Sequence, residues 1–171
     1  KPSEILNDNG TPGDPGDDFY PQANYRQSGP VTFGFNMIST DDARVISNDI
    51  VMAQWQTVKG EHSLELSGHI TQTNNRGIIN MLPAGKTLTL SGDMDIWEDD
   101  EVLERRFVVD GTGKTLITGT ISDNEIGATG QDRRIQKTGT GVLVINVAPG
   151  ANNHSGPEIV TMGNLHYANN G

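Results

Sequence analysis

Two glycine-lysine-threonine segments are the first residues of this chain that suggest chemistry. Residues 111–117 read GTGKTLI, and residues 85–90 read GKTLTL. A nucleotide-binding P-loop has the form G-x-x-x-x-G-K-[ST], because its backbone N–H groups must surround the phosphates before the lysine reaches them. The leading glycine would fall on Val108 in one copy and on Asn80 in the other. Both segments continue into strand and turn residues, so the pattern argues against an NTPase and indicates a repeat.

A run of charged residues is the chain's best catalytic candidate by residue type. Polysaccharide-cleaving sites need clustered carboxylates beside a basic residue. The candidates are Glu98, Asp99, Asp100, Glu101, Glu104, Arg105 and Arg106. They follow one another along a single stretch, which favours a solvated loop with local ion pairs. We therefore predict that the protein is not an enzyme.

The four histidines, His62, His69, His154 and His166, show no metal-ligand spacing. His62 and His69 are close in the sequence and could share a strand edge, but a surface role is the simpler interpretation. No Ser-His-Asp arrangement can be read from the spacing.

Calcium is the cofactor that the sequence favours most. The segment NDNGTPGD and the residues after it carry oxygen ligands at alternate positions around a glycine turn, as calcium sites do. The candidate ligands are Asp8, Asn9, Asp14, Asp17 and Asp18. No bidentate glutamate follows at the expected place, and two prolines interrupt the pattern. A polar leader without metal is the alternative.

Composition restricts the partners. The net charge is −10, which argues against nucleic acid and against an anionic membrane surface. No run of about 18 apolar residues is present to span a bilayer, and no signal peptide is visible. The chain begins at Lys1 and contains no cysteine. We expect a processed form that, if exported, is stable without disulfides.

The glycines reveal the repeat. Gly85, Gly113 and Gly141 recur at equal intervals, and an apolar residue precedes each at the same distance: Ile79, Phe107 and Ile135. SLELSGHI (63–70) also matches TLTLSGDM (87–94), at a slightly shorter interval. We expect about four units of roughly 24–28 residues, with equivalent glycines at corners and the three apolar residues stacked inside. The stretch 31–59 would supply one or two degenerate units.

These units favour a β-solenoid. Their apolar runs are short and alternate, as in Leu64 and Leu66. Such short runs cannot cross a globular core, but they can form the sides of coils that stack about 4.8 Å apart. The apolar fraction of 33%, the aromatic fraction of 5% and the 21 glycines suit a narrow aliphatic core with many turns. The stretch 94–107 is the exception. We expect it to form an excursion from one coil that could hold a helical turn.

The C-terminal repeat resembles the autotransporter-associated β-strand repeat, whose form is K-T-G-x-G-x-L-x-L-x-G-x-N-x-[YH]-x-G followed by two strands. The matching residues are Lys137, Thr138, Gly139, Gly141, Leu143, Ile145, Asn153, Gly156, Gly163 and Leu165. Asn146-Val147 departs from the usual Ser-Gly. The resemblance is good over 131–171, partial over 61–130 and absent over 1–60. It implies a right-handed β-helix on an exported or cell-surface protein and assigns no chemistry.

Together these features predict an all-β, right-handed parallel β-helix of about four to six coils. Residues 1–30, which hold five of the eight prolines, would form an irregular N-terminal arm or linker, and residues 31–171 the solenoid. The expected function is extracellular and structural: a subunit that stacks end to end into a filament or surface layer, with glycans or cell-surface components as further partners. A stalk or adhesin fragment is the alternative, and a polysaccharide-active β-helix enzyme comes third.

Overall fold

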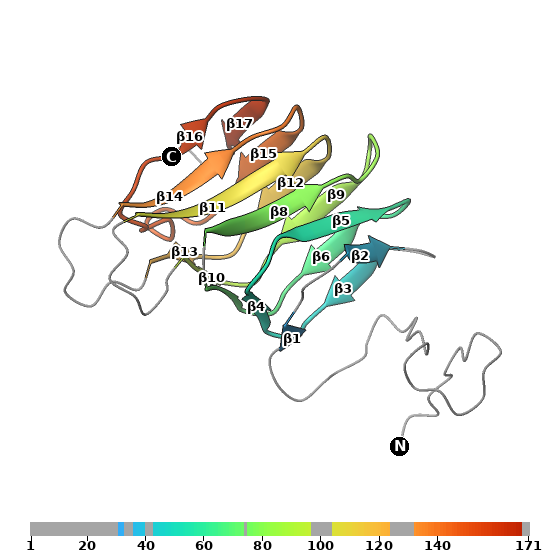
Figure 1. Cartoon of the computed structure of the whole chain (residues 1–171), viewed down its shortest axis with the longest axis horizontal. Helices are drawn as coiled ribbons and strands as arrows, with labels where there is room; N and C mark the ends of the chain where they lie inside the picture. Colours follow the sequence, from blue (N-terminus) through green and yellow to red (C-terminus); the bar gives the residue numbers. More distant parts are fainter. Residues whose placement is uncertain are drawn as a thin grey trace, which may run out of the picture.

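The chain folds as a β-solenoid. The computed structural model describes residues 31–32, 36–39, 43–73, 75–96, 104–123 and 132–168, and the regular elements in these ranges are all strands. Three parallel sheets run side by side along one axis, and successive coils contribute one strand to each sheet, except that the last described coil adds none to the first sheet (Figure 1). The predicted fold class is therefore confirmed, while residues 1–30, the predicted arm, lie outside the described residues.

The three sheets differ in strand length. The first sheet contains β1 (Val31–Thr32), β4 (Ile50–Met52), β7 (Ile70–Gln72), β10 (Met94–Asp95) and β13 (Ile121–Ser122). The second contains β2 (Asn36–Ser39), β5 (Gln56–Gly60), β8 (Arg76–Asn80), β11 (Glu104–Gly111), β14 (Asp132–Lys137) and β16 (Ile159–Val160). The third contains β3 (Arg44–Ile46), β6 (Leu64–Leu66), β9 (Thr87–Leu90), β12 (Lys114–Ile117), β15 (Val142–Ile145) and β17 (Asn164–Tyr167).

Alternating side chains build the core. Leu64 pairs with Leu88 and Leu66 with Leu90, and all four are buried. Glu65, which lies between the two inward leucines of β6, is only half-buried. The same period of two recurs along the other strands, so the inward residues of successive coils stack into aliphatic columns. The predicted match between residues 63–70 and 87–94 is confirmed by this register.

Glycines allow neighbouring coils to approach closely at the corner before the first sheet. Gly68, Gly92 and Gly119 occupy successive coils there, above Asn48 of the preceding coil. A Cβ atom on Gly68 would overlap the carbonyl oxygen of Asn48, one on Gly92 that of Gly68, and one on Gly119 that of Gly92. Glycine is therefore required at this corner, because a side chain would overlap the backbone of the preceding coil.

The predicted glycine register is right for one step and wrong for the other. Thr115 pairs with Leu143, which preserves the interval from Gly113 to Gly141, so these two glycines are equivalent, as predicted. On its other side Thr115 pairs with Leu88, and this interval is one position shorter than the interval from Thr115 to Leu143. Gly85 therefore lies one position away from the place that is equivalent to Gly113. The cause is turn length, because the connection from β8 to β9 is longer than the one from β11 to β12.

The predicted apolar stack needs the same kind of correction. Phe107 pairs with Ile135 and both are buried, as expected. On its other side Phe107 pairs with Arg76, whereas Ile79 pairs with Asp110 and faces outward, half-buried. The coil between β8 and β11 is longer than its neighbours, which shifts the register of the second sheet.

Compared with the following coil, the extra length falls in the connection from β8 to β9, residues 81–86, and not in the stretch 94–107, the predicted excursion. The two ends of that stretch form β10 and the start of β11, so these ends are strand rather than the expected helical turn. Residues 97–103 lie outside the described part of the chain.

The crowded corner makes a stability prediction. Replacing Gly92 with Ala should lower the free energy of unfolding by about 3 kcal/mol, because the added methyl group meets backbone that cannot move without separating two coils. Gly85 is a matched control, since a Cβ there meets nothing within 4 Å and its φ of 82° is the sole source of strain. Gly85→Ala should cost only about 1 kcal/mol. Chemical denaturation monitored by circular dichroism measures both, and equal losses would contradict the corner argument.

Candidate functional site

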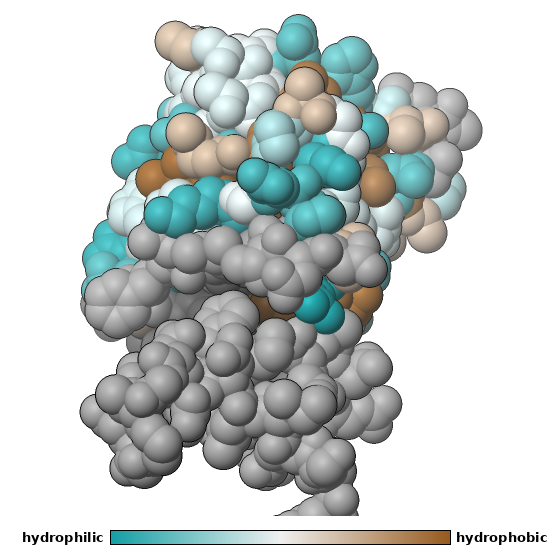
Figure 2. Space-filling model, turned by 90° about the vertical axis from the view of Figure 1, so that its right-hand side faces the viewer, coloured by the Kyte–Doolittle hydropathy of each residue, from teal (hydrophilic) through white to brown (hydrophobic). Residues whose placement is uncertain are grey.

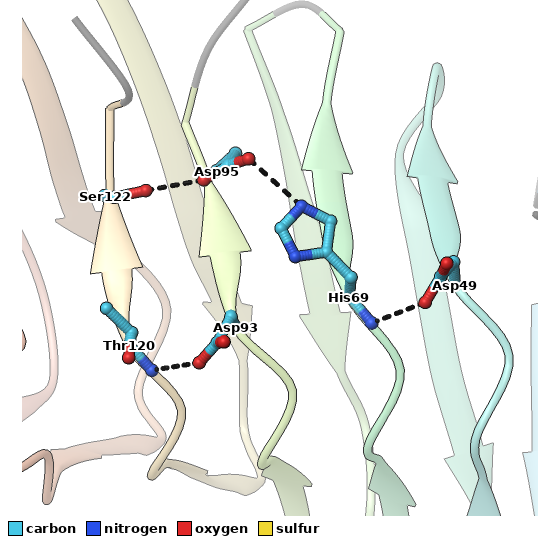
Figure 3. A network of polar contacts seen from close by, with 6 residues as sticks. All are labelled: Asp49, His69, Asp93, Asp95, Thr120 and Ser122. Carbon is cyan, nitrogen blue, oxygen red and sulfur yellow. Dashed lines mark hydrogen bonds and ion pairs between the residues drawn. The ribbon is translucent and has the colours of Figure 1, made fainter.

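Polar side chains form a row on the outer face of the first sheet. Asp49 accepts a hydrogen bond from the backbone N–H of His69 in the next coil at 3.0 Å, and Asp93 accepts one from the backbone N–H of Thr120 at 2.9 Å. Each aspartate follows the corner residue of its coil, so the same geometry recurs at two levels of the solenoid. These bonds run parallel to the axis and tie one coil to the next (Figure 3).

A third carboxylate bridges three coils in the same row. Asp95 on β10 accepts from Nε2 of His69 at 3.0 Å on one side and from the hydroxyl of Ser122 on β13 at 2.5 Å on the other. Figure 3 shows the carboxylate between the two partners. The imidazole is 41% exposed, so its contact with Asp95 is screened by water and contributes on the order of 1 kcal/mol or less.

The order of these three groups bears on catalysis. In a serine-nucleophile site the imidazole lies between the hydroxyl and the carboxylate, so that it can take the hydroxyl proton. Here Asp95 lies in the middle, and His69 contacts the carboxylate rather than Ser122. The histidine is therefore not placed to activate the serine. The arrangement is suited to holding coils together.

A second polar cluster lies in the last described coil. Oε1 of Glu158 accepts from Nδ2 of Asn152 at 3.0 Å and faces Nε2 of His154 at 3.2 Å, and its carboxylate also accepts from the hydroxyl of Tyr167 on β17. His154 is buried, with 2% of its side chain exposed, and Glu158 is 26% exposed. Three polar groups from two segments, residues 152–154 and β17, thus converge on one carboxylate of the last described coil.

The protonation of this cluster follows from its partners. Nδ1 of His154 lies 2.8 Å from the carbonyl oxygen of Arg133, and since a carbonyl can only accept, Nδ1 must donate. Burial disfavours the charge of Glu158, but the hydrogen bonds from Tyr167 and Asn152 outweigh it and hold the pKa of Glu158 below its ordinary value. Burial, and then the neighbouring carboxylate, raise the pKa of Tyr167. Glu158 is therefore a bound carboxylate and a poor proton acceptor.

A buried lysine is the third candidate. Burial lowers the pKa of Lys137, and the charge of Asp110 opposes this. A lysine with a lowered pKa is a possible nucleophile. Its side chain is 1% exposed, however, and its Nζ donates to the carbonyl oxygens of Thr138 and Gly139, the latter at 2.9 Å. The ammonium group is enclosed at the corner between β14 and β15, where it satisfies backbone carbonyls.

The sequence-predicted candidates are only partly placed. Asp8, Asn9, Asp14, Asp17 and Asp18, the candidate calcium ligands, lie outside the described residues, as do Glu98, Asp99, Asp100 and Glu101. Glu104 and Arg105 lie on β11, next to Arg106. Nη1 of Arg106 donates to Oε1 of Gln136 in the following coil at 3.4 Å. Within the part of the chain that is described, no three histidine or acidic side chains gather as metal ligands would.

The histidines separate into different settings. His62 lies in the turn between β5 and β6, and His69 at the corner before β7, so the two do not share a strand. His166 faces outward from β17, and His154 is the buried member of the Glu158 cluster. The sequence shows no metal-ligand spacing for any of the four and favoured a surface role for His62 and His69, so the contacts of His69 and His154 were not predicted. The usable signal was the recurring corner pattern, SNDI at 47–50, SGHI at 67–70 and SGDM at 91–94.

Comparisons of this chain with models of protein families, with curated proteins and with solved structures find no match. The described ranges also contain no helix that is long and apolar enough to cross a membrane.

The Glu158 cluster makes a pH prediction. Because the pKa of Glu158 is lower in the folded protein, its stabilising effect is complete above the unfolded pKa, near 4.5, and is lost as the pH falls through the folded value. Glu158→Gln should remove this part of the acid sensitivity, a change on the order of 1 kcal/mol for a partly exposed group.

The measurement is the free energy of unfolding from neutral pH down to strongly acidic pH. Tyr167→Phe is the matched variant, because it removes one donor and keeps the carboxylate. It should move the acid loss of stability toward higher pH. Identical pH profiles for the parent and both variants would contradict the assigned network.

Proposed function

We propose that this protein is an extracellular structural subunit, a β-solenoid that stacks end to end with copies of itself into a filament or surface layer. The observation that carries the proposal is the edge of β17. In the described residues this strand has a neighbour, β15, on one side only. A parallel strand edge with unpaired amide and carbonyl groups templates the pairing of another strand.

The backbone of β17 determines which groups face that edge. Asn164 N–H donates to the carbonyl of Gly141 at 3.2 Å, and Ala168 N–H donates to that of Ile145 at 3.0 Å, so both point toward the β15 side. Peptide groups alternate in direction along a strand. The N–H and C=O groups of Leu165 and Tyr167 therefore point the opposite way, toward the edge.

Exposed apolar side chains accompany this edge. Val160 is 45% exposed, Met162 55% and Tyr167 39%, and all three belong to the last described coil. Such residues favour contact with another apolar surface. By contrast, the polar residues in the outer row of the first sheet are engaged with adjacent coils of the same molecule.

The extracellular setting is part of the proposal and is supported by the resemblance of residues 131–171 to a passenger-type repeat. The alternative is a stalk or adhesin within a longer exported protein. In that case β17 would pair with a further coil of its own chain. The two proposals differ in whether the isolated protein associates with itself.

A proline at the edge tests the proposal. Leu165→Pro removes an edge-facing N–H without breaking a hydrogen bond to β15 and should keep the fold but shift the protein from polymers to small species, at least tenfold lower in average mass. Leu165→Ala is the matched control, because it loses most of the same side chain and keeps the amide, and it should still polymerise. Light scattering over a range of concentrations, with electron microscopy, gives the sizes.

Two results would decide against the proposal. If the parent protein stays monomeric at high concentration, with or without added Ca²⁺, self-assembly is wrong and the stalk alternative is favoured. If the parent polymerises and Leu165→Pro does so equally well, the edge of β17 is not the contact. Circular dichroism of both variants verifies that the solenoid remains folded.

A further inference from the structure

The two ends of the third sheet are complementary in hydrogen bonding. At the opposite end from β17, β3 pairs with β6 only, within the described residues. Arg44 N–H donates to the carbonyl of Ser63 at 3.2 Å, and the carbonyl of Ile46 accepts from Ser67 N–H at 2.8 Å, so both residues face β6. By alternation, the N–H and C=O of Val45 point to the outer edge.

We propose that β17 of one copy pairs in parallel with β3 of the next copy, with His166 opposite Val45. This inference rests on the proposed function and identifies the surface of the partner copy. In parallel sheets a residue donates to the residue before its opposite partner and accepts from the residue after it. Val45 N–H then donates to the carbonyl of Leu165, and Val45 C=O accepts from Tyr167 N–H.

The parity of the edges excludes a slip by one residue from this register. Arg44 lies opposite Leu64 within the molecule and donates to Ser63, the residue before it, which is the same pattern. A slip by one residue would set Val45 opposite Leu165. The groups then required at the edge would be those of Asn164 and His166, which point toward β15 instead. A one-residue slip also reverses the inward and outward faces of the strand.

The proposed register continues the internal columns. One column of the third sheet runs from Ile46 through Leu66 and Leu90 to Ile145 and Tyr167, and the next copy would set its Ile46 beside Tyr167. Ile46 already packs partly against the core of its own copy. The contact therefore extends an apolar stack that exists on both sides of it.

Charge distinguishes contact between unlike ends from contact between like ends. Glu158 is an acidic residue of the last described coil, and Arg44 is a basic residue of the strand at the other end, in line with inward-facing Leu64. Head-to-tail stacking brings opposite charges to the junction, whereas two like ends would bring Glu158 toward Glu158 or Arg44 toward Arg44. In Figure 2, which views the molecule from the right-hand side of Figure 1, the coloured surface mixes hydrophobic and hydrophilic residues. Because the two surfaces that meet are different, each added copy presents the same free end again, and further copies can be added in the same way.

Cysteine cross-linking tests this register directly, because the chain contains no cysteine of its own. In the proposed contact the Cα atoms of residues 45 and 166 are about 4.8 Å apart, which is within disulfide range. Oxidised Val45→Cys/His166→Cys should give a ladder of covalent multimers on a non-reducing gel. Val45→Cys/Asn164→Cys is the matched control: the second cysteine is on the same face of β17, about 7 Å further along the strand, and should cross-link at least tenfold less.

The outcomes separate this inference from the proposed function. A ladder with the 45/166 pair and little with the 45/164 pair supports the register. Strong cross-linking of 45/164, or covalent dimers from His166→Cys by itself, overturns it in favour of a shifted register or a contact between like ends. Polymers without any 45/166 disulfide also overturn the register while leaving assembly intact. Monomers in light scattering of the parent protein overturn the proposed function as well.

Discussion

The whole structure depends on the requirement that each coil follow the backbone path of the coil before it at the spacing of a parallel sheet. At the corner before the first sheet this leaves no space for a side chain, and a Cβ on Gly68, Gly92 or Gly119 would overlap a carbonyl of the preceding coil. Once the corners coincide, the inward positions of successive strands must stack. A narrow core of leucine and isoleucine is then sufficient, since each side chain meets its neighbours above, below and across.

Buried polar residues add specificity to this stacking. Nδ2 of Asn80 donates to the carbonyl of Lys114 at 2.8 Å and to Oγ1 of Thr115 at 3.0 Å, and its Oδ1 accepts from Leu82 N–H at 3.0 Å. Gln72 donates across coils to the carbonyl of Arg106 at 2.6 Å. A shift of either coil would leave these buried amide groups without partners, at a cost of about 1–3 kcal/mol for each. The polar interior therefore helps to fix which residues of successive coils lie opposite one another.

The fold could be predicted from the sequence because it depends on local signals. Alternation in SLELSGHI and TLTLSGDM, together with the glycine at each corner, defines short strands that must stack. The register between successive coils was harder to predict from the sequence, because it depends on the length of every connection. One longer turn displaced Gly85 by a position, and one longer coil moved Ile79 away from Phe107. The contacts of His69 with Asp95 and of Glu158 with Tyr167 were missed for the same reason: they join residues whose proximity follows only from the correct register.

The distribution of hydrogen-bonded polar groups explains why the ends of the solenoid are better candidates for recognition than its sides. On the outer face of the first sheet, carboxylates, hydroxyls and amides of adjacent coils satisfy one another, as with Asp93 and the amide of Thr120. A ligand there would have to replace bonds that already exist, with little net gain. At β17 the edge-facing peptide groups of Leu165 and Tyr167 can be satisfied by a strand that repeats the internal geometry, and β3 carries that geometry at the other end of the same sheet. The constraint that stacks coils within one molecule is therefore the same constraint that the proposed assembly extends between molecules.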